Sequence, residues 1–196
     1  MIVGILLAAG QARRFGSNKL IQPWGSRGEP VLIHSLLSLK ASCDQVLVVV
    51  GPQNYAELTP WIEQHGCAWT LAPDAHLGMG HSLAHGIANS PPCLGWIIGL
   101  ADMPAVNCST TVQLADALKE GHSIAVPVMN QRRGNPVGFS FVHRVSLMQL
   151  TGDEGARRLI KTHAGQIHWV EVQDLGIHHD IDQPADLLWP TSVPNQ

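Results

Sequence analysis

Short apolar runs alternate with stretches of helical composition along most of the chain, and this alternation restricts the fold more than any other feature. Runs rich in Val, Ile and Leu lie at 2–7, 45–50, 69–72, 96–100 and 123–128, and helical stretches follow the first four at 31–40, 55–65, 81–89 and 109–120. The runs at 46–50 and 96–100 lack apolar–polar alternation, which is typical of parallel strands that helices cover on both faces. The pattern predicts an α/β fold: a Rossmann-like, open, mixed but mainly parallel sheet with helices on both faces.

The pattern loosens after residue 130. Gly and Pro punctuate residues 132–138, a helix is predicted at 154–162, and strands are predicted near 167–172 and 177–181. A mixed sheet is expected in this part of the chain. Because no linker and no repeat of 20 to 50 residues is visible, we expect one domain over residues 1–189, followed by a polar tail at 190–196.

Charge and cysteine content exclude several classes of protein. The 196 residues include 12 Lys and Arg against 15 Asp and Glu, and no run of five like charges occurs, so nucleic acid is not an expected partner. The apolar opening at 2–9 is too short to cross a membrane, and no membrane association is expected. The chain has four cysteines, Cys43, Cys67, Cys93 and Cys108, and no two of them form a CxxC motif. This spacing argues against a zinc ribbon or a disulfide scaffold and favours a reducing cytoplasm as the location of the protein.

The loop that follows the first predicted strand is suited to an anionic ligand. In open α/β sheets, ligands bind beyond the carboxyl ends of the strands. Residues 7–19 begin with small residues and contain three basic residues and no acid. Backbone N–H groups after a strand can hold oxygen atoms, and Arg and Lys neutralise phosphate charge. The alternative is an ordinary surface turn with solvated basic side chains, and the spacing of Gly10, Gly16 and Lys19 is not that of a P-loop.

Asp102 is predicted to lie at the carboxyl edge of the sheet. It follows the apolar run at 96–100 and precedes Pro104, which cannot continue a central strand. A carboxylate there is suited to Mg²⁺, which takes oxygen ligands from one or two carboxylates, phosphates and water. The alternative is an Asp that caps the next turn.

Two further carboxylates lie close together near the end of the chain. Asp180 and Asp182 would point to one face if the segment is extended, while Ile181 points to the other. Asp182 also precedes Gln183 and Pro184, a pattern typical of the N-terminal cap of a helix. A ligand role and a capping role therefore compete at this position.

The segment 78–82 precedes a predicted helix and offers a flexible backbone and a hydroxyl group. Gly78, Gly80 and Ser82 would suit hydrogen bonding to the edge of a nucleobase, and the alternative is a helix start capped by Ser82. His81 and His85 are one helical turn apart, but no zinc site is expected because the pattern lacks a third ligand.

Taken together and in order, five stretches of the chain resemble the MobA-like nucleotidyltransferases, especially the molybdenum cofactor cytidylyltransferases. They are Ala8-Ala9-Gly10 with Arg14, Gly16 and Lys19, then Gly78–Leu83, Ala101–Pro104, Gly134–Pro136 with Gly152–Arg157, and Asp180–Pro184. The chain departs from the family pattern at three positions, where the family usually has Ser, His and Thr; these are Ala12, Asn135 and Gln183.

The resemblance implies a fold of the nucleotide-diphospho-sugar transferase type, Mg²⁺ as cofactor, and roles for individual residues. The catalytic residues would be Arg14, Lys19 and Asp102. The nucleotide would contact Leu7, Ala8, Ala9, Gly10, Arg14, Lys19, Gly78, Gly80, Ser82 and Asp102. The acceptor would contact Arg133, Asn135, Asp153 and Arg157. The metal would bind Asp102 and Asp182, with Asp180 assisting.

The resemblance also implies the substrates. CMP would pass from CTP to the terminal phosphate of molybdopterin, pyrophosphate would leave, and a client molybdoenzyme or its chaperone would be a partner. Cytosine rests on Ala9, because relatives that use GTP tend to have Gly there. The alternatives are a guanylyltransferase, another small-phosphate nucleotidyltransferase of the same architecture, or a noncatalytic carrier of molybdenum cofactor.

Overall fold

A computed structural model describes residues 1–10, 15 and 17–188, which form an eight-stranded mixed sheet with helices on both faces. The order along the sheet is β10-β7-β9-β6-β1-β4-β5, and β8 pairs with β7. β9 runs antiparallel to both of its neighbours and β8 is antiparallel to β7, while the other pairs are parallel. The strands are β1 Ile2–Leu7, β4 Gln45–Val50, β5 Ala68–Leu71, β6 Gly95–Leu100, β7 Ile124–Met129, β8 Arg132–Arg133, β9 Val137–Ser140 and β10 Ile167–Glu171. The predicted fold class is confirmed.

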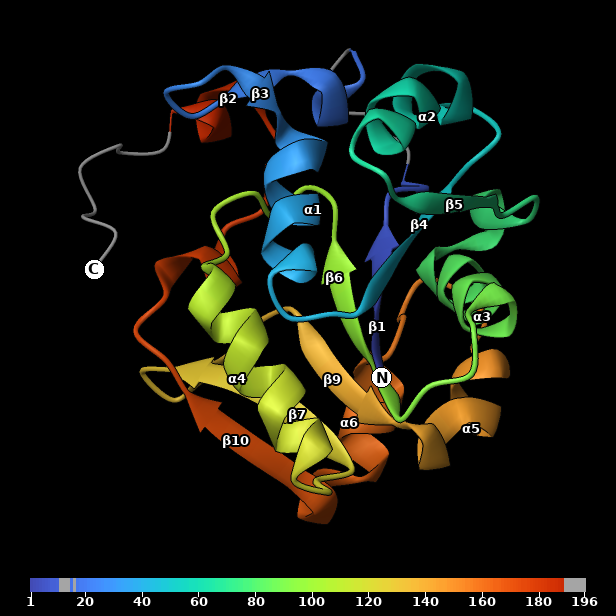
Figure 1. Cartoon of the computed structure of the whole chain (residues 1–196), viewed down its shortest axis with the longest axis vertical. Helices are drawn as coiled ribbons and strands as arrows, with labels where there is room; N and C mark the ends of the chain where they lie inside the picture. The colour runs from blue at the N-terminus through green and yellow to red at the C-terminus, as the bar shows by residue number, and fades with distance from the viewer. Residues whose placement is uncertain (11–14, 16, 189–196) are drawn as a thin grey trace.

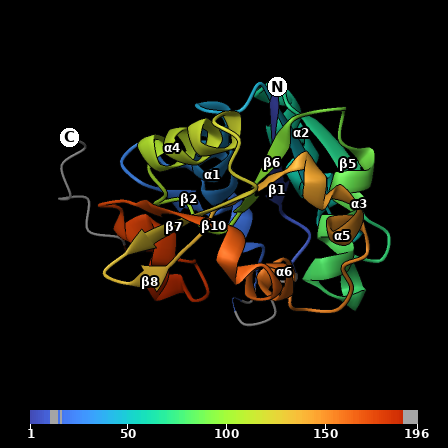
Figure 2. The same cartoon turned by 90° about the horizontal axis from the view of Figure 1, so that it is seen from below.

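The helices form two layers, one on each face of the sheet (Figures 1 and 2). They are α1 Val31–Lys40, α2 Tyr55–Gln64, α3 Met79–Asn89, α4 Cys108–Lys119, α5 Arg144–Met148 and α6 Arg157–Thr162. One core lies beneath α1, α2 and α4, and the other beneath α3, α5 and α6. Successive residues of β1 alternate between them, since Leu6 belongs to the first core and Ile5 to the second. Burying such a side chain stabilises the fold by about 1.5–3 kcal/mol.

α3 packs closely against the sheet at Gly86, in the second half of the helix. A Cβ atom added there would lie 2.7 Å from a methyl carbon of Val49 and 3.1 Å from one of Ile5. The close approach fixes how α3 sits above β1 and β4, and it places the N-terminal end of the helix near the carboxyl ends of these strands.

Several elements of the structure differ from the predictions or were not predicted. The strand predicted near 177–181 is wrong: the chain forms a 3-10 turn at Leu175–His178, in which Asp174 Oδ1 accepts a hydrogen bond from Gly176 N at 2.9 Å. The helix predicted at 154–162 begins only at Arg157, and β9 and α5 were not predicted. A two-stranded hairpin, β2 Pro23–Trp24 and β3 Glu29–Pro30, was also missed.

Three expectations about the whole chain concern membrane spans, cysteines and the tail. No helix in the part of the chain that the structure describes is long and apolar enough to span a membrane. All four cysteines are free thiols. The predicted polar tail at 190–196 lies outside the described residues.

Candidate active site

A pocket of about 460 Å³ opens at the carboxyl ends of β1 and β6, whose arrowheads point toward the top of Figure 1. Its volume lies in the range of about 300–1,000 Å³ that small-molecule sites occupy. Predicted nucleotide-binding residues make up most of its lining, namely Leu7, Ala8, Ala9, Gly10, Gly78, Ser82 and Asp102. The lining also includes Asp153, which was predicted for the acceptor. Five further residues without a predicted role complete it, namely Leu20, Ala75, His76, Met79 and Leu100. Ser82 is 4% exposed, and its hydroxyl has no hydrogen-bond partner among the described residues.

Two amides from the neighbouring loop hold the backbone of residues 8–10. The Asn54 side chain donates a hydrogen bond to the carbonyl of Ala8 at 2.7 Å and accepts one from Gly51 N at 3.0 Å. The Gln53 side chain donates to the carbonyl of Ala9 at 2.7 Å. Both carbonyls are therefore turned toward the loop after β4. The sequence analysis missed these amides, although they follow a predicted strand at the edge where ligands bind.

Asp102 and Asp182 converge on one ammonium group although they are far apart in the sequence. Lys19 Nζ lies 2.8 Å from Asp102 Oδ2 and 3.1 Å from Asp182 Oδ1. Burial by itself lowers the pKa of Lys19, but the attraction and hydrogen bonds of the two carboxylates outweigh burial and raise the pKa above its ordinary value. Two acids that are distant in the sequence therefore lie together at Lys19, and their role as metal ligands stays a prediction.

The third carboxylate lies on the same segment. Ile181 is fully buried, and its N–H donates to the Asp102 carbonyl at 2.8 Å, while Asp180 and Asp182 on either side are exposed. The alternation predicted for a strand is thus present without strand pairing. Partial burial raises the pKa of Asp180, and the negative charges of Asp182 and Asp102 raise it further.

The capping role that the sequence offered for Asp182 is filled by its neighbours, and its ligand role stays a prediction. The 3-10 turn Pro184–Leu187 has Gln183 as its N-cap residue, and a capping box links Gln183 with Asp186. Asp182 lies outside the box, which leaves its carboxylate to Lys19. Asp186 Oδ2 accepts hydrogen bonds from the amides of Asp182 at 2.8 Å and Gln183 at 2.7 Å.

The loop before α6 closes over the start of α3 and brings Asp153 to the pocket. Gly80 N donates to the Gly152 carbonyl at 2.7 Å, and Gly152 N donates to His81 Nδ1 at 3.3 Å. Gly78 has φ +123°, and a Cβ atom there would lie 2.5 Å from Asp153 Oδ1, so this close contact requires glycine. Gly80 lies beside the pocket lining rather than in it. Asp153, expected on the acceptor side, lines the same pocket as the nucleotide-binding candidates.

Two of the predicted positions, Arg14 and Ala12, lie outside the described residues. Three acceptor-side candidates are described but do not line this pocket. Arg133 is half-buried in β8, and Arg157 is exposed at the start of α6; neither guanidinium forms a hydrogen bond or ion pair with the described part of the chain. Asn135 donates its backbone N–H to the Ile177 carbonyl at 3.0 Å. Arg133, Asn135 and Arg157 remain predictions for the acceptor side, and Arg14 remains a prediction for the nucleotide.

The metal-binding potential of the site rests on carboxylates. Among residues 1–10, 15 and 17–188, no group of three or more His, Cys, Asp or Glu side chains is arranged to hold a metal ion. His81 and His85 do not form a zinc site, because His81 bonds to Gly152 and His85 Nε2 bonds to Thr70 Oγ1 at 2.8 Å. The pair formed by Asp102 and Asp182 offers the oxygen ligands that hard divalent cations prefer.

Comparison with known proteins agrees with this arrangement. The model of the MobA-like NTP transferase domain matches residues 4–167. The purine catabolism protein PucB of Bacillus subtilis is 36% identical, with 94% of this chain and 93% of PucB covered. A protein of Deinococcus radiodurans named probable molybdenum cofactor guanylyltransferase is 29% identical, with 95% and 92% covered. The crystal structure of an Rv0371c homologue from Mycobacterium sp. strain JC1 superposes with a TM-score of 0.82 at 29% identity, with 94% and 92% covered.

The fold, the carboxylates beside a strand-end pocket and these relatives define an enzyme of the nucleotidyltransferase class. Within that class, the relation extends along nearly the whole chain. The chain belongs to the MobA-like NTP transferase family, as the five sequence stretches predicted.

Proposed function

We propose that this enzyme transfers CMP from CTP to the terminal phosphate of molybdopterin, with release of pyrophosphate and dependence on Mg²⁺. The observation that carries the proposal is the pair of carboxylates, Asp102 and Asp182, that share Lys19 beside a pocket of nucleotide size. The name of the relative from Deinococcus radiodurans supports the acceptor, since it refers to molybdenum cofactor. A client molybdoenzyme or its chaperone would receive the product.

The residues of the site act by positioning and charge rather than as nucleophiles. The acceptor phosphate attacks the α-phosphorus of the nucleotide in line, and negative charge grows on the α-phosphate oxygens and on the departing bridge oxygen. Lys19 and Arg14 would neutralise the triphosphate, and the backbone of residues 8–10 would hold it in place. Loss of one such contact costs on the order of 3 kcal/mol, or about a hundredfold in rate.

The carboxylates fit a magnesium ion. Asp102 and Asp182 would hold Mg²⁺, with Asp180 nearby, and the bound ion would neutralise charge on the α- and β-phosphate oxygens. One Lys19 ammonium already lies within 3.1 Å of both carboxylates, so the two side chains are close enough to share a single cation. With the carboxylates engaged in this way, Lys19 would be free to pair with the phosphates.

The preference for cytosine rests on the wall of the pocket. Ala9 lines the pocket and is 4% exposed, so its methyl group narrows the space that a purine would need. A guanylyltransferase is the second candidate, because the relative from Deinococcus radiodurans carries that name. On the acceptor side we propose Arg133, Asn135 and Arg157, together with Asp153.

The test is a pyrophosphate-release assay with CTP, GTP and a molybdopterin acceptor. Asp102→Ala is expected to lower kcat/KM about a hundredfold. Asp116→Ala is the matched control, because Asp116 is an exposed acid paired only with Lys119, at 3.0 Å. Undiminished turnover by Asp102→Ala, or no turnover by the wild type, would contradict the proposal and favour a carrier. Equal kcat/KM values for CTP and GTP would refute the argument from Ala9.

A further inference from the structure

We infer that Asp186 is a positioning residue that aims the Asp182 carboxylate at the shared cation position between Asp102 and Asp182. The inference rests on the proposed function, in which Asp182 is a metal ligand. Asp186 does not itself contact Lys19 or line the pocket. Its effect would pass through the backbone of Asp182.

The Asp182 side chain has little to hold it in place except its own backbone. It is 53% exposed, and the hydrogen bond from Lys19 at 3.1 Å is its one polar contact within the described residues. Packing therefore does not fix the direction of the carboxylate. The orientation of the peptide groups on either side of Asp182 decides where the carboxylate points.

Asp186 fixes both of these peptide groups with a single oxygen. Its Oδ2 accepts a hydrogen bond from Asp182 N at 2.8 Å and another from Gln183 N at 2.7 Å. Hydrogen bonds to a charged acceptor are stronger than those between neutral groups.

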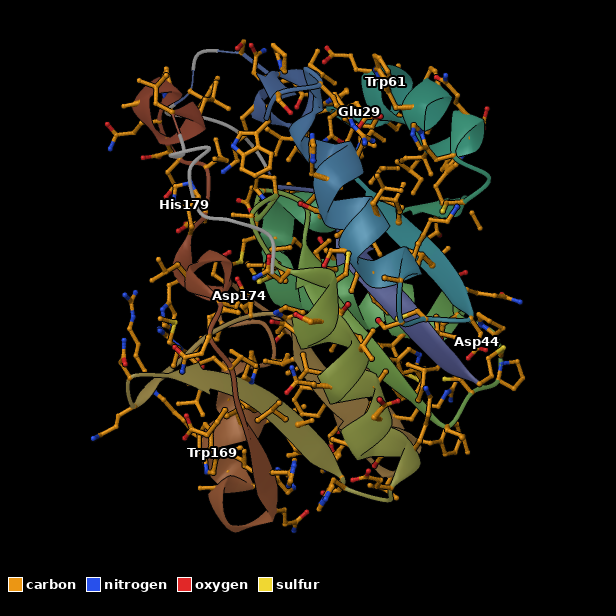
Figure 3. The ribbon with its side chains drawn as sticks, turned by 60° about the vertical axis from the view of Figure 1, so that its left-hand side comes forward. Glu29, Asp44, Trp61, Trp169, Asp174 and His179 are labelled. Atoms are coloured by element: carbon orange, nitrogen blue, oxygen red, sulfur yellow. The ribbon has the colours of Figure 1, made fainter. Side chains whose placement is uncertain are left out.

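The segment around Asp182 is anchored on both sides, so the two hydrogen bonds to Asp186 join parts of the chain that are themselves held in place. Ile181 is fully buried and its N–H bonds to the Asp102 carbonyl at 2.8 Å. The His179 imidazole lies 3.1 Å from the Asp186 carbonyl through Nε2. Figure 3 shows His179 on the segment that leads from Asp174 toward the 3-10 turn at Pro184–Leu187. Between these anchors, the N–H of Asp182 itself is held by Asp186.

Groups that orient metal ligands usually change metal affinity when they are removed, by about 10- to 100-fold. We therefore expect Asp186→Ala to weaken Mn²⁺ binding about tenfold or more. Binding is measured by the EPR signal of free Mn²⁺ in the presence of a nonhydrolysable CTP analogue. The same titration with the analogue and no protein is the blank. The Mg²⁺ concentration that gives half-maximal pyrophosphate release is expected to rise to the same extent. Asp186→Asn keeps an acceptor oxygen and is expected to restore most of the affinity.

A matched control distinguishes orientation of the Asp182 carboxylate by Asp186 from capping of the 3-10 turn. Gln183→Ala removes the other half of the capping box but leaves the bond from Asp182 N to Asp186. We expect Gln183→Ala to bind Mn²⁺ within about twofold of the wild type, against the shift of about tenfold or more that loss of an orienting group gives. Asp186→Ser, with a shorter side chain that does not reach both amides, replaces Asp186→Ala if that variant does not fold.

Three results would overturn the inference: unchanged Mn²⁺ affinity in the Asp186 variants, an equal loss in Gln183→Ala, or no Mn²⁺ binding by the wild type. Failure of the proposed function would give a different result, because the wild type would then release no pyrophosphate with CTP or GTP. In that case the Mn²⁺ measurement still decides whether Asp186 acts on a cation site.

Discussion

Replacing Asn54 with Leu should destabilise the protein and disturb its pocket at the same time. Asn54 is 7% exposed, and its side chain satisfies the Ala8 carbonyl and the Gly51 N–H at 2.7 and 3.0 Å. Leu is similar in size but can bond to neither group. Each backbone group left without a partner in a buried place costs about 1–3 kcal/mol, so the free energy of unfolding should fall by about 2–6 kcal/mol.

Urea denaturation followed by circular dichroism measures this change, with the midpoint expected to fall while the slope stays the same. Gln53→Ala is the matched control, because Gln53 is exposed and makes one bond to the Ala9 carbonyl. Its loss should cost only about 0.5–1.5 kcal/mol. A loss below about 1 kcal/mol for Asn54→Leu would refute the reasoning, because it would mean that water or a shifted backbone satisfies both groups.

Three further predictions follow from buried contacts. Gly80→Ala should lower the melting temperature, because its Cβ would lie 2.6 Å from a backbone oxygen of the neighbouring loop, whereas Gly165→Ala, with open space around it, should not. Burial, and then the nearby His163 imidazole, lower the pKa of His143. The folded state therefore binds fewer protons than the unfolded state, and the free energy of unfolding should fall as pH drops below about 6.5. His143→Phe should flatten this pH dependence, measured by thermal unfolding at several pH values. Burial raises the pKa of Cys43 to about 11, so iodoacetamide at pH 7.5 should label the exposed Cys108 and leave Cys43 unmodified in mass spectra; equal labelling would contradict this.

The sequence predicted the parallel part of the sheet well because its signal is local. The run at 45–50 becomes β4 with the same limits, and five of its six residues are buried. β9 escaped prediction because Val137–Ser140 is a four-residue segment that contains a glycine, and its place between β6 and β7 depends on strands distant in the sequence. The segment at 177–181 is apolar and β-branched in part, but the side chain of Asp174 and the close approach of Gly176 to the backbone of Ala105 favour a 3-10 turn.

The site was predictable to the extent that its residues stand at strand ends. Asp102 comes two residues after the end of β6, so its position at the pocket could be predicted from the strand alone. The hydrogen bonds of the Asn54 and Asp186 side chains were not predictable in this way, because each depends on backbone groups that only the folded chain brings near. Asp182 was left between two roles for the same reason: the capping box that excludes it is formed by Gln183 and Asp186.

The late position of Asp182 in the sequence has a consequence for truncation of the protein. Every described strand of the main sheet is complete by residue 171, and the walls of the pocket end at Asp153, yet the second carboxylate comes at residue 182. The segment that carries it is joined to the rest of the site by the hydrogen bond from Ile181 N to the Asp102 carbonyl. A chain cut after residue 172 would therefore keep these strands and the pocket lining but lose one of the two acids around Lys19.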